Sequence, residues 1–378
     1  MANLADIDIT TGEATTRPYR RGPDPDRDIA VLMSGGVDSS VAASLLCEAG
    51  WNVVGITLQL PVAAKADRDG LCAGNEAAEV ARNLDIAHYC LDVRDVFERL
   101  VIEPFRRAYE QGRTPSPCVD CNTLFKFGAV WEAIKTQLGV SNLATGHYAR
   151  VIREDDNDFL VQGDDRSRDQ SYFLYGIPRH RLAYLHLPLE DLTKDEVRRV
   201  ANESALPAAH REDSMELCFA AGSDYRAALG LPAEKGSILD IDGKVIGEHN
   251  GIANYTTGQR KGVGVAAGKP IYVISIDPVA NTITVGSREQ ALKCHVDAQD
   301  TSILIPEQMT AGAELFGKIR SQGEPAACVL TEVGESTMTV RFVEEQFAPT
   351  AGQRLVLYDS HSRVVAGGVI CSGCDCNH

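Results

Sequence analysis

Short apolar runs alternate with segments of helical periodicity from Ile29 to about Phe219. The apolar runs predict buried strands of a parallel sheet at residues 29–33, 51–60, 87–91 and 143–145. The segments between and after them predict one helix that ends at Cys47 and others at 75–84, 101–110 and 127–138. Strands that alternate with helices predict an α/β fold with a doubly wound parallel sheet and right-handed crossovers. A ligand of such a sheet lies beyond the carboxyl ends of its strands.

The second half of the chain changes to short alternating strands. Residues 237–290 alternate apolar and polar positions and contain turns such as Asp242-Gly243, which predicts a small β-rich module. Residues 299–370 continue this alternation and predict a small β-barrel. Its clearest strands run from Thr337 to Phe342 and from Arg354 to Tyr358.

These patterns divide the chain into five parts. They are a disordered leader at 1–28, a sheet domain at 29–222, a central β-rich domain at 223–292, a C-terminal β-barrel at 293–370 and a cysteine-rich tail at 371–378. The leader carries Asp, Arg and Pro without an apolar segment, so it is neither a signal peptide nor an anchor. In the sheet domain, Thr193 and Glu196 have the spacing of a capping box, which starts a helix that ends near Ser204.

The composition is that of a soluble globular protein, with 44% hydrophobic and 24% charged residues. No apolar run approaches the roughly 20 residues of a membrane span, so we expect a cytoplasmic protein without a membrane partner. The formal net charge of −16 argues against wholesale electrostatic binding of nucleic acid, unless Lys and Arg gather on one face. Eleven cysteines without a secretory signal favour reduced, catalytic or metal-binding thiols.

A Gly-rich turn with the sequence SGGVDS, at residues 34–39, separates the first strand from the first helix. Its glycines let the backbone approach a polyanion, and the N–H groups at the helix start supply donors. The turn lacks the lysine of a G-x-x-x-x-G-K-[ST] loop and the spacing of a dinucleotide-binding G-x-G-x-x-G. It resembles the pyrophosphate loop of ATP pyrophosphatases, in which Asp38 would help to hold magnesium–pyrophosphate. An ordinary turn of an α/β domain is the alternative. Gly146 and His147 also follow a strand, so the two loops can face one crevice.

Three cysteines stand where chemistry is expected. Cys118 and Cys121 form a C-x-x-C after a proline turn, and Cys218 stands alone. The pair fits half of a zinc site, a redox pair, ligands of a metal cluster, or simple packing. ATP activation makes a carbonyl electrophilic, and a thiolate or persulfide can displace the adenylate, so the loop and the thiols together indicate sulfur transfer. That sulfur must be a low-pKa thiolate or a persulfide, which a positive helix end could favour.

The remaining cysteines carry weaker signals. Most of the isolated ones lie among apolar residues and are predicted to be core thiols, namely Cys47, Cys72, Cys90, Cys294 and Cys328. The C-terminal tail carries Cys371, Cys374 and Cys376 with His378, which fits a metal site, a sulfur relay or incidental thiols at a chain end.

Seven ordered motifs are similar to those of the tRNA-specific 2-thiouridylases, which thiolate the wobble uridine at C2. The resemblance covers about residues 29–370. The motifs are SGGVDS at 34–39, TPSPCVDCNTLFKFG at 114–128, ATGHYAR at 144–150, RDQSYFL at 168–174, DSMELCF at 213–219, YTTGQRKG at 255–262, and AGQ with AGG near the C-terminus. The resemblance implies a sheet of the adenine nucleotide alpha-hydrolase-like, PP-loop type, followed by the two β domains.

The resemblance also implies a role for each matching residue. ATP would be bound by Leu32, Met33, Ser34, Gly35, Gly36, Val37, Asp38, Ser39, Leu58 and Gly146. Cys121 is implied as the nucleophile that pairs in a disulfide with Cys218, and Cys218 as the carrier of the persulfide. The target base would lie against Ser116, Pro117 and Cys118. The tRNA would be contacted by His147, Arg168, Asp169, Gln170, Arg320, Ser321 and Gln353.

The implied reaction is adenylation of the uridine O2 by ATP, followed by attack of sulfur at C2 and loss of AMP. ATP and Mg²⁺ are the implied cofactors, and the partners are the anticodon loop of tRNA and a sulfur-donor protein or hydrosulfide. The chain departs from the family pattern at Cys118, where Asp is usual, and at Leu58, where Met is usual. Cys118, Cys121 and Cys218 resemble the ligands of thiolases that hold a [4Fe–4S] cluster, so a cluster and a persulfide mechanism both remain open.

Two other functions fit part of the pattern. Another PP-loop adenylating ligase, which amidates a carbonyl, would need an ammonia source and would leave Cys121 and Cys218 without a role. A metal-stabilised RNA-binding module would leave the SGGVDS turn unexplained. Pyrophosphate release that depends on both tRNA and a sulfur source distinguishes the three functions.

Overall fold

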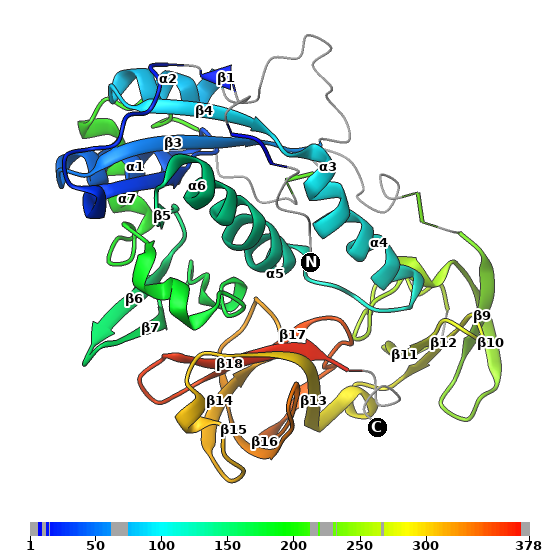
Figure 1. Ribbon diagram of the computed structural model, residues 1–378. Helices are drawn as coiled ribbons and strands as arrows, with labels where there is room; N and C mark the ends of the chain where they lie inside the picture. Colours follow the sequence, from blue (N-terminus) through cyan, green and yellow to red (C-terminus); the bar gives the residue numbers. More distant parts are fainter. Residues whose placement is uncertain are drawn as a thin grey trace. The chain divides into compact units, whose positions relative to one another are not determined.

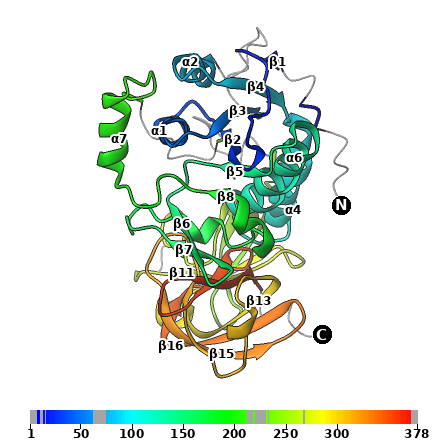
Figure 2. The ribbon, with the colours of Figure 1, turned by 60° about the vertical axis from the view of Figure 1, so that its left-hand side comes forward.

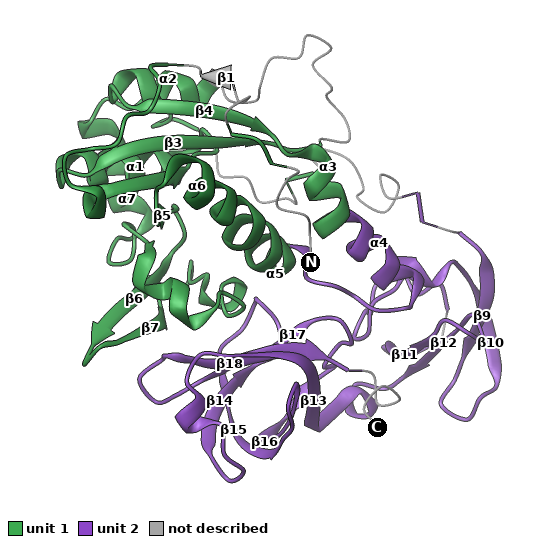
Figure 3. Ribbon diagram, in the orientation of Figure 1, with its two compact units in different colours: residues 1–101, 118–223 green, residues 102–117, 224–378 purple. Residues whose placement is uncertain are grey.

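The computed structural model describes most of the chain and divides it into two compact units. The described residues are 7–9, 13–14, 16–61, 75–211, 218–219, 230–231, 233–265 and 268–371. Unit 1 comprises residues 1–101 and 118–223, and unit 2 comprises residues 102–117 and 224–378 (Figure 3). The two units are described separately below.

Unit 1 is built on a six-stranded sheet with the order β1-β4-β3-β2-β5-β8 (Figure 1). The strands are β1 Glu13–Ala14, β2 Asp28–Leu32, β3 Asn52–Gln59, β4 Ala87–Asp92, β5 Asn142–Ala144 and β8 Leu185–His186. Neighbours from β4 to β8 pair in parallel. All five residues of β2 are buried, as expected for a strand covered on both faces. The predicted α/β fold with a parallel sheet is therefore confirmed.

Three helices of this sheet begin and end close to the predicted positions. They are α1 Val37–Glu48, α2 Asn75–Asn83 and α7 Lys194–Glu203. The predicted capping box is present at the start of α7, where the Thr193 and Glu196 side chains each accept a bond from the other residue's backbone N–H. Helices α1 and α7 lie side by side (Figure 2), and Val41 of α1 shares a buried cluster with Val197 and Ala201 of α7.

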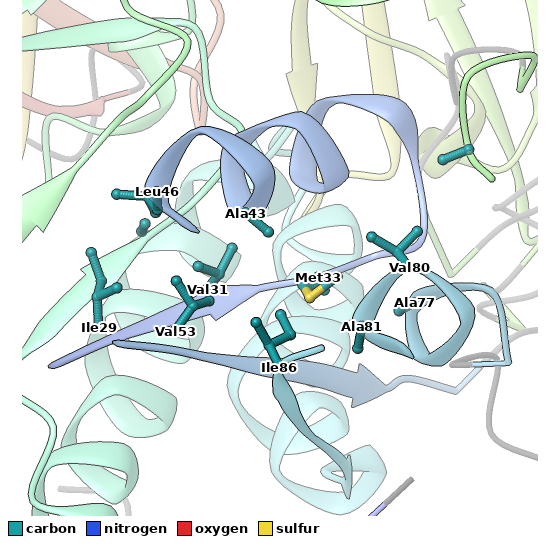
Figure 4. Packing of buried hydrophobic residues seen from close by; sticks show 12 residues of the cluster. Ile29, Val31, Met33, Ala43, Leu46, Val53, Ala77, Val80, Ala81 and Ile86 are labelled. Atoms are coloured by element: carbon teal, nitrogen blue, oxygen red, sulfur yellow. The ribbon is translucent and has the colours of Figure 1, made fainter. Parts of the chain in front are cut away.

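A second buried cluster joins the central strands to their helices. Figure 4 shows β2 contributing Ile29 and Val31, with Met33 directly after the strand, while α1 contributes Ala43 and Leu46. The other labelled members of this cluster are Val53 of β3, Ile86, and three residues of α2, namely Ala77, Val80 and Ala81. Burying each large aliphatic side chain stabilises the fold by about 1.5–3 kcal/mol. This packing fixes the carboxyl end of β2, from which the SGGVDS turn emerges.

Two further helical runs contain π-helical segments that the sequence does not predict. One is α3 Arg94–Phe97, π-helix η3 Glu98–Ile102 and α4 Glu103–Glu110. The other is α5 Pro117–Asp120, π-helix η4 Cys121–Val130 and α6 Trp131–Leu138. The helices predicted at 101–110 and 127–138 therefore start too late, since the two runs begin at Arg94 and Pro117. An apolar period of 3.6 residues per turn does not match the i→i+5 hydrogen bonding of a π-helix. The second run begins directly at the proline turn, where Pro117 fits a first helical position.

The disordered leader predicted at 1–28 is corrected by the structure, which places part of it against the sheet. Strand β1 pairs antiparallel with β4, through Glu13 opposite Cys90. The Tyr19 N–H donates to the Tyr89 hydroxyl at 2.9 Å, and Thr16 donates to the Ile86 carbonyl at 2.9 Å. The polar composition of this segment does not predict its order, because the edge of a sheet can bind a polar segment through backbone hydrogen bonds.

Unit 2 contains a four-stranded sheet and a closed barrel of six strands. The sheet has the order β10-β9-β12-β11, with β9 Lys235–Leu239, β10 Val245–Asn250, β11 Tyr272–Asp277 and β12 Thr282–Gly286. The barrel consists of β13 Leu292–Ile303, β14 Glu314–Lys318, β15 Ala326–Val333, β16 Thr337–Phe347, β17 Arg354–Tyr358 and β18 Val364–Ile370. The predicted turn joins β9 to β10, where Gly243 has φ +81°. The expected β-rich module and β-barrel are confirmed.

Smaller elements complete the described chain. A separate hairpin in unit 1 consists of β6 Ala149–Glu154 and β7 Asn157–Gln162. The short 3-10 helices are η2 Pro25–Arg27, η5 Ser171–Phe173, η6 Arg179–Tyr184, η7 Ile252–Asn254, η8 Glu289–Ala291 and η9 Pro306–Gln308. Within the described residues, every helix is too short or too polar to cross a membrane.

Candidate active site

The SGGVDS turn, residues 34–39, forms a loop between β2 and α1 that we call the phosphate loop. Gly35 has φ +78°, a left-handed conformation that favours glycine, and Gly36 caps α1. The Ser34 N–H donates to Ser39 Oγ at 3.2 Å, and Ser39 Oγ donates to the Gly36 carbonyl at 3.2 Å. These bonds fix the loop at the positive end of a 12-residue helix, an arrangement suited to phosphate.

Asp38 of the phosphate loop is held by two residues distant in sequence. Its Oδ1 accepts a hydrogen bond from the Tyr148 hydroxyl at 2.7 Å. Lys194 Nζ lies 2.7 Å from Oδ1 and 2.9 Å from Oδ2. Both carboxylate oxygens therefore have protein donors, and their negative charge is matched by a buried ammonium group.

Gly146 packs directly on the phosphate loop. A Cβ at this position would lie 2.7 Å from the carbonyl carbon of Asp38 and 2.8 Å from the N atom of Ser39. Any larger residue must therefore displace the backbone of one loop or the other. The two loops predicted to face one crevice are in direct contact.

His147 extends this contact toward the cysteines. Its Nδ1 lies 2.7 Å from Thr145 Oγ1, and its ring centroid is 5.9 Å from that of Phe127 in η4. Burial, together with the positive charge of Lys126, lowers the pKa of His147 to about 3, so the ring is neutral at physiological pH. The segment 144–148 thus contacts the phosphate loop on one side and the π-helix on the other.

The π-helix brings Lys126 and Cys121 to the same side of one helix. Cys121 is its first residue, and i→i+5 winding lets residues five apart share a face. Lys126 Nζ donates to Asn122 Oδ1 at 3.3 Å, and Asn122 Nδ2 donates to the Phe173 carbonyl at 3.1 Å. Lys126 is therefore steered by a hydrogen-bonded neighbour on its own helix.

Cys118, Cys121 and Cys218 are free thiols in this structure. Burial raises the pKa of Cys121 to about 11, although Lys126 acts in the opposite direction. Cys118 and Cys218 are exposed residues, yet desolvation by the surrounding protein raises the pKa of both thiols, again opposed by Lys126. Of the two alternatives expected from the sequence, the structure does not favour a low-pKa thiolate, because desolvation outweighs the nearby cation and raises the pKa of each thiol; the persulfide stays a prediction.

The three cysteines do not form the ligand set of a cluster in this structure. Among the described residues, which include all three, no group of three or more His, Cys, Asp and Glu side chains is placed to hold a metal ion. Cys121 is buried, with 6% of its surface exposed, whereas Cys118 and Cys218 are exposed. Electrostatic interactions nevertheless join Cys121 to both Cys118 and Cys218, so the three thiols lie near one another, and the choice between a cluster and a persulfide mechanism stays a prediction.

Comparison with known proteins identifies the family of this chain. Residues 27–222 match the tRNA methyl transferase HUP domain, residues 229–287 the tRNA methyl transferase PRC-barrel domain, and residues 293–370 the aminomethyltransferase beta-barrel domain. The chain is 41% identical over 352 residues to the tRNA-specific 2-thiouridylase MnmA of Moorella thermoacetica, with 90% of this chain and 98% of that protein covered. The chain belongs to the tRNA-specific 2-thiouridylase family.

Other members are similar at the same level. The MnmA protein of Clostridium botulinum strain Alaska E43 is 38% identical over 355 residues, which covers 91% of this chain and 98% of the relative. That of Rickettsia akari is 42% identical over 357 residues, with 90% and 96% covered. The match therefore extends over all three modules of a 2-thiouridylase.

Two residues predicted to contact tRNA in this 2-thiouridylase, Asp169 and Gln170, also make hydrogen bonds within unit 1. Asp169 Oδ1 accepts from the Gly163 N–H at 3.0 Å and from the Ser171 N–H at 3.1 Å. Gln170 exchanges bonds with Tyr148: its N–H donates to the Tyr148 carbonyl at 2.7 Å, and its Oε1 accepts from the Tyr148 N–H at 3.0 Å. Arg168 is exposed beside them. The role of these residues toward tRNA stays a prediction.

In unit 2, a predicted tRNA contact holds the proline turn. Gln353 Nε2 donates to the Thr114 carbonyl at 2.9 Å and to the Pro115 carbonyl at 3.3 Å. Gly352 approaches Thr114 so closely that a Cβ would lie 3.0 Å from its carbonyl oxygen. Ser116, at the end of this turn, is buried. Gln353 therefore holds the two residues directly before Ser116, the first residue predicted to lie against the base, and its contact with tRNA stays a prediction.

The roles predicted for Leu58, Arg320 and Ser321 stay predictions. Leu58 is in β3 opposite Leu91 of β4. Arg320 donates to the Phe347 carbonyl, next to Ser321. Cys90 is buried, as predicted for a core residue, but it is disulfide-bonded and therefore not a free thiol, which corrects that part of the prediction. Cys72 and residues 372–378 lie outside the described residues.

Sequence reasoning missed Lys126, Tyr148, Lys194 and Arg211 as site residues. Lys126 and Tyr148 stand inside the quoted motifs, so the motif match itself was the available signal. Lys194 is 156 residues from Asp38, and Arg211 is 176 residues from Gly35, to whose carbonyl it donates at 3.0 Å. No local pattern reveals such pairs.

Proposed function

We propose that this protein is an ATP-dependent tRNA 2-thiouridylase that acts on the wobble uridine. One observation carries the proposal. In a single compact unit, the segment 144–148 packs on the phosphate loop through Gly146 and on the thiol-bearing π-helix through His147. A nucleotide at the loop and sulfur at the cysteines can then reach one carbonyl.

The first step is adenylation. The uridine O2 attacks the α-phosphorus of ATP, the bond from that phosphorus to the β-phosphate oxygen breaks, and pyrophosphate leaves. The N–H groups at the start of α1 and the phosphate loop bind the negative charge of the phosphates. Mg²⁺, held with the help of Asp38, neutralises further charge when it is bound. AMP is now a leaving group on C2.

The second step transfers sulfur. The terminal sulfur of a Cys218 persulfide attacks C2, and AMP departs with the electrons of the C2–O bond. The Cys121 thiolate then attacks the Cys218 Sγ, so the sulfur–sulfur bond to the base breaks and the base keeps its sulfur as 2-thiouridine. A Cys121–Cys218 disulfide remains. Hydrosulfide attack on its Cys218 sulfur gives a new persulfide and a Cys121 thiol, without an added oxidant. A persulfide-bearing donor protein can instead transfer its outer sulfur to the Cys218 thiolate and leave as a thiol, once a dithiol reductant has opened the Cys121–Cys218 disulfide and has itself been oxidised.

Lys126 contributes to this step by its charge. Its positive charge partly offsets the rise that desolvation causes in the pKa of Cys118, Cys121 and Cys218. Lys126 thus favours the anionic sulfur that each attack requires. The anticodon loop of tRNA suits such a site because its bases are unpaired and can turn outward.

The test is product analysis with omission controls. The protein is incubated with unmodified tRNA, ATP, Mg²⁺ and sulfide, and the tRNA nucleosides are analysed by mass spectrometry. We expect 2-thiouridine, and one pyrophosphate for each 2-thiouridine formed. No product should form when ATP is omitted. An amidated nucleoside would instead identify a ligase, and tRNA binding without any pyrophosphate release would identify a binding module.

A further inference from the structure

The phosphate loop has no lysine of its own, yet the folded chain brings two cations to it. Lys194 Nζ lies 2.7 and 2.9 Å from the two carboxylate oxygens of Asp38. Arg211 donates to the Gly35 carbonyl at 3.0 Å and is ion-paired with Glu76. All of these residues belong to unit 1.

We infer that Lys194 and Arg211 are positioning residues of the pyrophosphate site: Lys194 holds and balances the Asp38 carboxylate, and Arg211 holds the Gly35 carbonyl of the phosphate loop. Lys194 acts through the Asp38 carboxylate, and Arg211 acts through the Gly35 carbonyl. This inference rests on the proposed ATP reaction and adds the residues that make the loop selective for pyrophosphate.

The ion pair between Lys194 and Asp38 differs from a surface ion pair because Lys194 is buried. Only 8% of its surface is exposed, so its ammonium group requires a partner within the protein. Asp38, which carries the one carboxylate of the phosphate loop, is such a partner, and Tyr148 donates to the same oxygen. Lys194 therefore fixes the orientation of the Asp38 carboxylate.

Docking of α7 does not explain this pair. The helix already packs on α1 through Val197 and Ala201, which share a buried cluster with Val41. The capping box at Thr193 sets where α7 begins and so makes Lys194 its first residue. Apolar packing thus holds the helix, and the cap aims Lys194 at Asp38.

Charge balance indicates the purpose of the two cations. In the structure, Lys194 is matched by Asp38 and Arg211 by Glu76. When magnesium–pyrophosphate reaches a loop that already holds Asp38, anionic groups accumulate, and without Lys194 they would repel one another. The adenosine part of the nucleotide gains nothing from these charges.

The experiment compares two probes by calorimetric titration. Inorganic pyrophosphate with Mg²⁺ and AMP are each titrated into the full-length wild type and the Lys194→Met variant. We expect pyrophosphate to bind about tenfold or more weakly to Lys194→Met, and AMP to bind within about twofold of wild type. Lys194→Arg, which keeps the charge, should stay within about threefold for both probes.

Arg199→Met is the matched control. It removes one charge from the same helix, but Arg199 is exposed and pairs with Glu203 at 3.6 Å. We expect wild-type binding of both probes. Thermal unfolding verifies that each variant is folded, and Arg211→Met repeats the test if Lys194→Met does not fold.

Equal pyrophosphate affinity for Lys194→Met and wild type overturns the inference and leaves the proposed function standing. Equal loss of pyrophosphate and AMP binding also overturns it, because that result indicates a structural role. A folded wild type that binds neither probe overturns both the inference and the proposed function.

Discussion

The phosphate loop and the three cysteines belong to the same unit, but only the loop is held ready by a network of bonds. Ser34, Ser39 and Asp38 are all hydrogen-bonded, and Gly146 packs on their backbone. The cysteines are free thiols whose raised pKa keeps them protonated. The loop is thus built for immediate binding of phosphate, whereas the thiols have to be activated.

This difference fits the order of the two chemical steps. Adenylation uses fixed donors and gains from their preorganisation. Sulfur transfer needs a reactive anion, and a permanently ionised thiolate would be open to oxidation before substrate arrives. Desolvation raises the pKa of the thiols and so keeps them protonated and unreactive. The positive charge of Lys126 opposes this rise, so the thiols can still be ionised when substrate is present.

Breaking the preorganised loop should have the largest effect. Gly146→Ala places a Cβ 2.7 Å from backbone atoms of Asp38, so one loop must move. We expect kcat/KM for ATP to fall about 100-fold, since small misplacements cost about that much. Steady-state pyrophosphate release measures this.

Gly50→Ala is the control for the glycine change. A Cβ there would meet no atom within 4 Å, although φ is +79°. It should cost about 1–2 kcal/mol of stability and leave turnover unchanged. Wild-type turnover by Gly146→Ala would show that the contact does not position the loop.

Removing the cation near the thiols should have a smaller effect. In Lys126→Met, the pKa of Cys121 and Cys218 should rise further because the charge that lowers it is lost. We expect the pH–rate profile of sulfur transfer to move up by about one unit, which slows the reaction about tenfold at neutral pH.

Lys126→Arg should restore most of that rate, and Lys135→Met, an exposed change further along the same helical run, should have no effect. A rate that falls equally at every pH in Lys126→Met would indicate a structural role instead.

The smallest expected effect is a difference in labelling rate among the three thiols. Cys121 is buried with a pKa of about 11, while Cys118 and Cys218 are exposed. Iodoacetamide should therefore label Cys121 several-fold more slowly than the other two at neutral pH. Because the pKa is raised, the thiolate fraction of Cys121 grows as pH increases, and its labelling should accelerate about tenfold per unit between pH 7 and 9. Peptide mass mapping measures each rate, and fastest labelling of Cys121 at neutral pH would contradict this assignment.

The sequence is a good guide to the elements that depend on local patterns. Apolar runs predict β2, β3 and β4 because strands buried on both faces are apolar throughout. The Thr193 capping box and the Gly243 turn are likewise set by side chains close in the chain.

The parts that escape prediction depend on tertiary contacts. The winding of η4 alters which residues share a face with Cys121, and no apolar period indicates it. The Lys194 contact with Asp38 joins residues 156 apart. The active-site charges are therefore visible only in the folded chain.

The central claim is that adenylation at the phosphate loop does not depend on the cysteines that transfer sulfur. Its most direct test is a single-turnover reaction of Cys218→Ser. Enzyme in excess over unmodified tRNA is mixed with ATP, Mg²⁺ and sulfide, and pyrophosphate and 2-thiouridine are counted in the same samples. We predict about one pyrophosphate per tRNA, released at close to the wild-type rate, and no 2-thiouridine. Formation of 2-thiouridine by Cys218→Ser, or loss of its tRNA-dependent pyrophosphate release, would contradict this prediction.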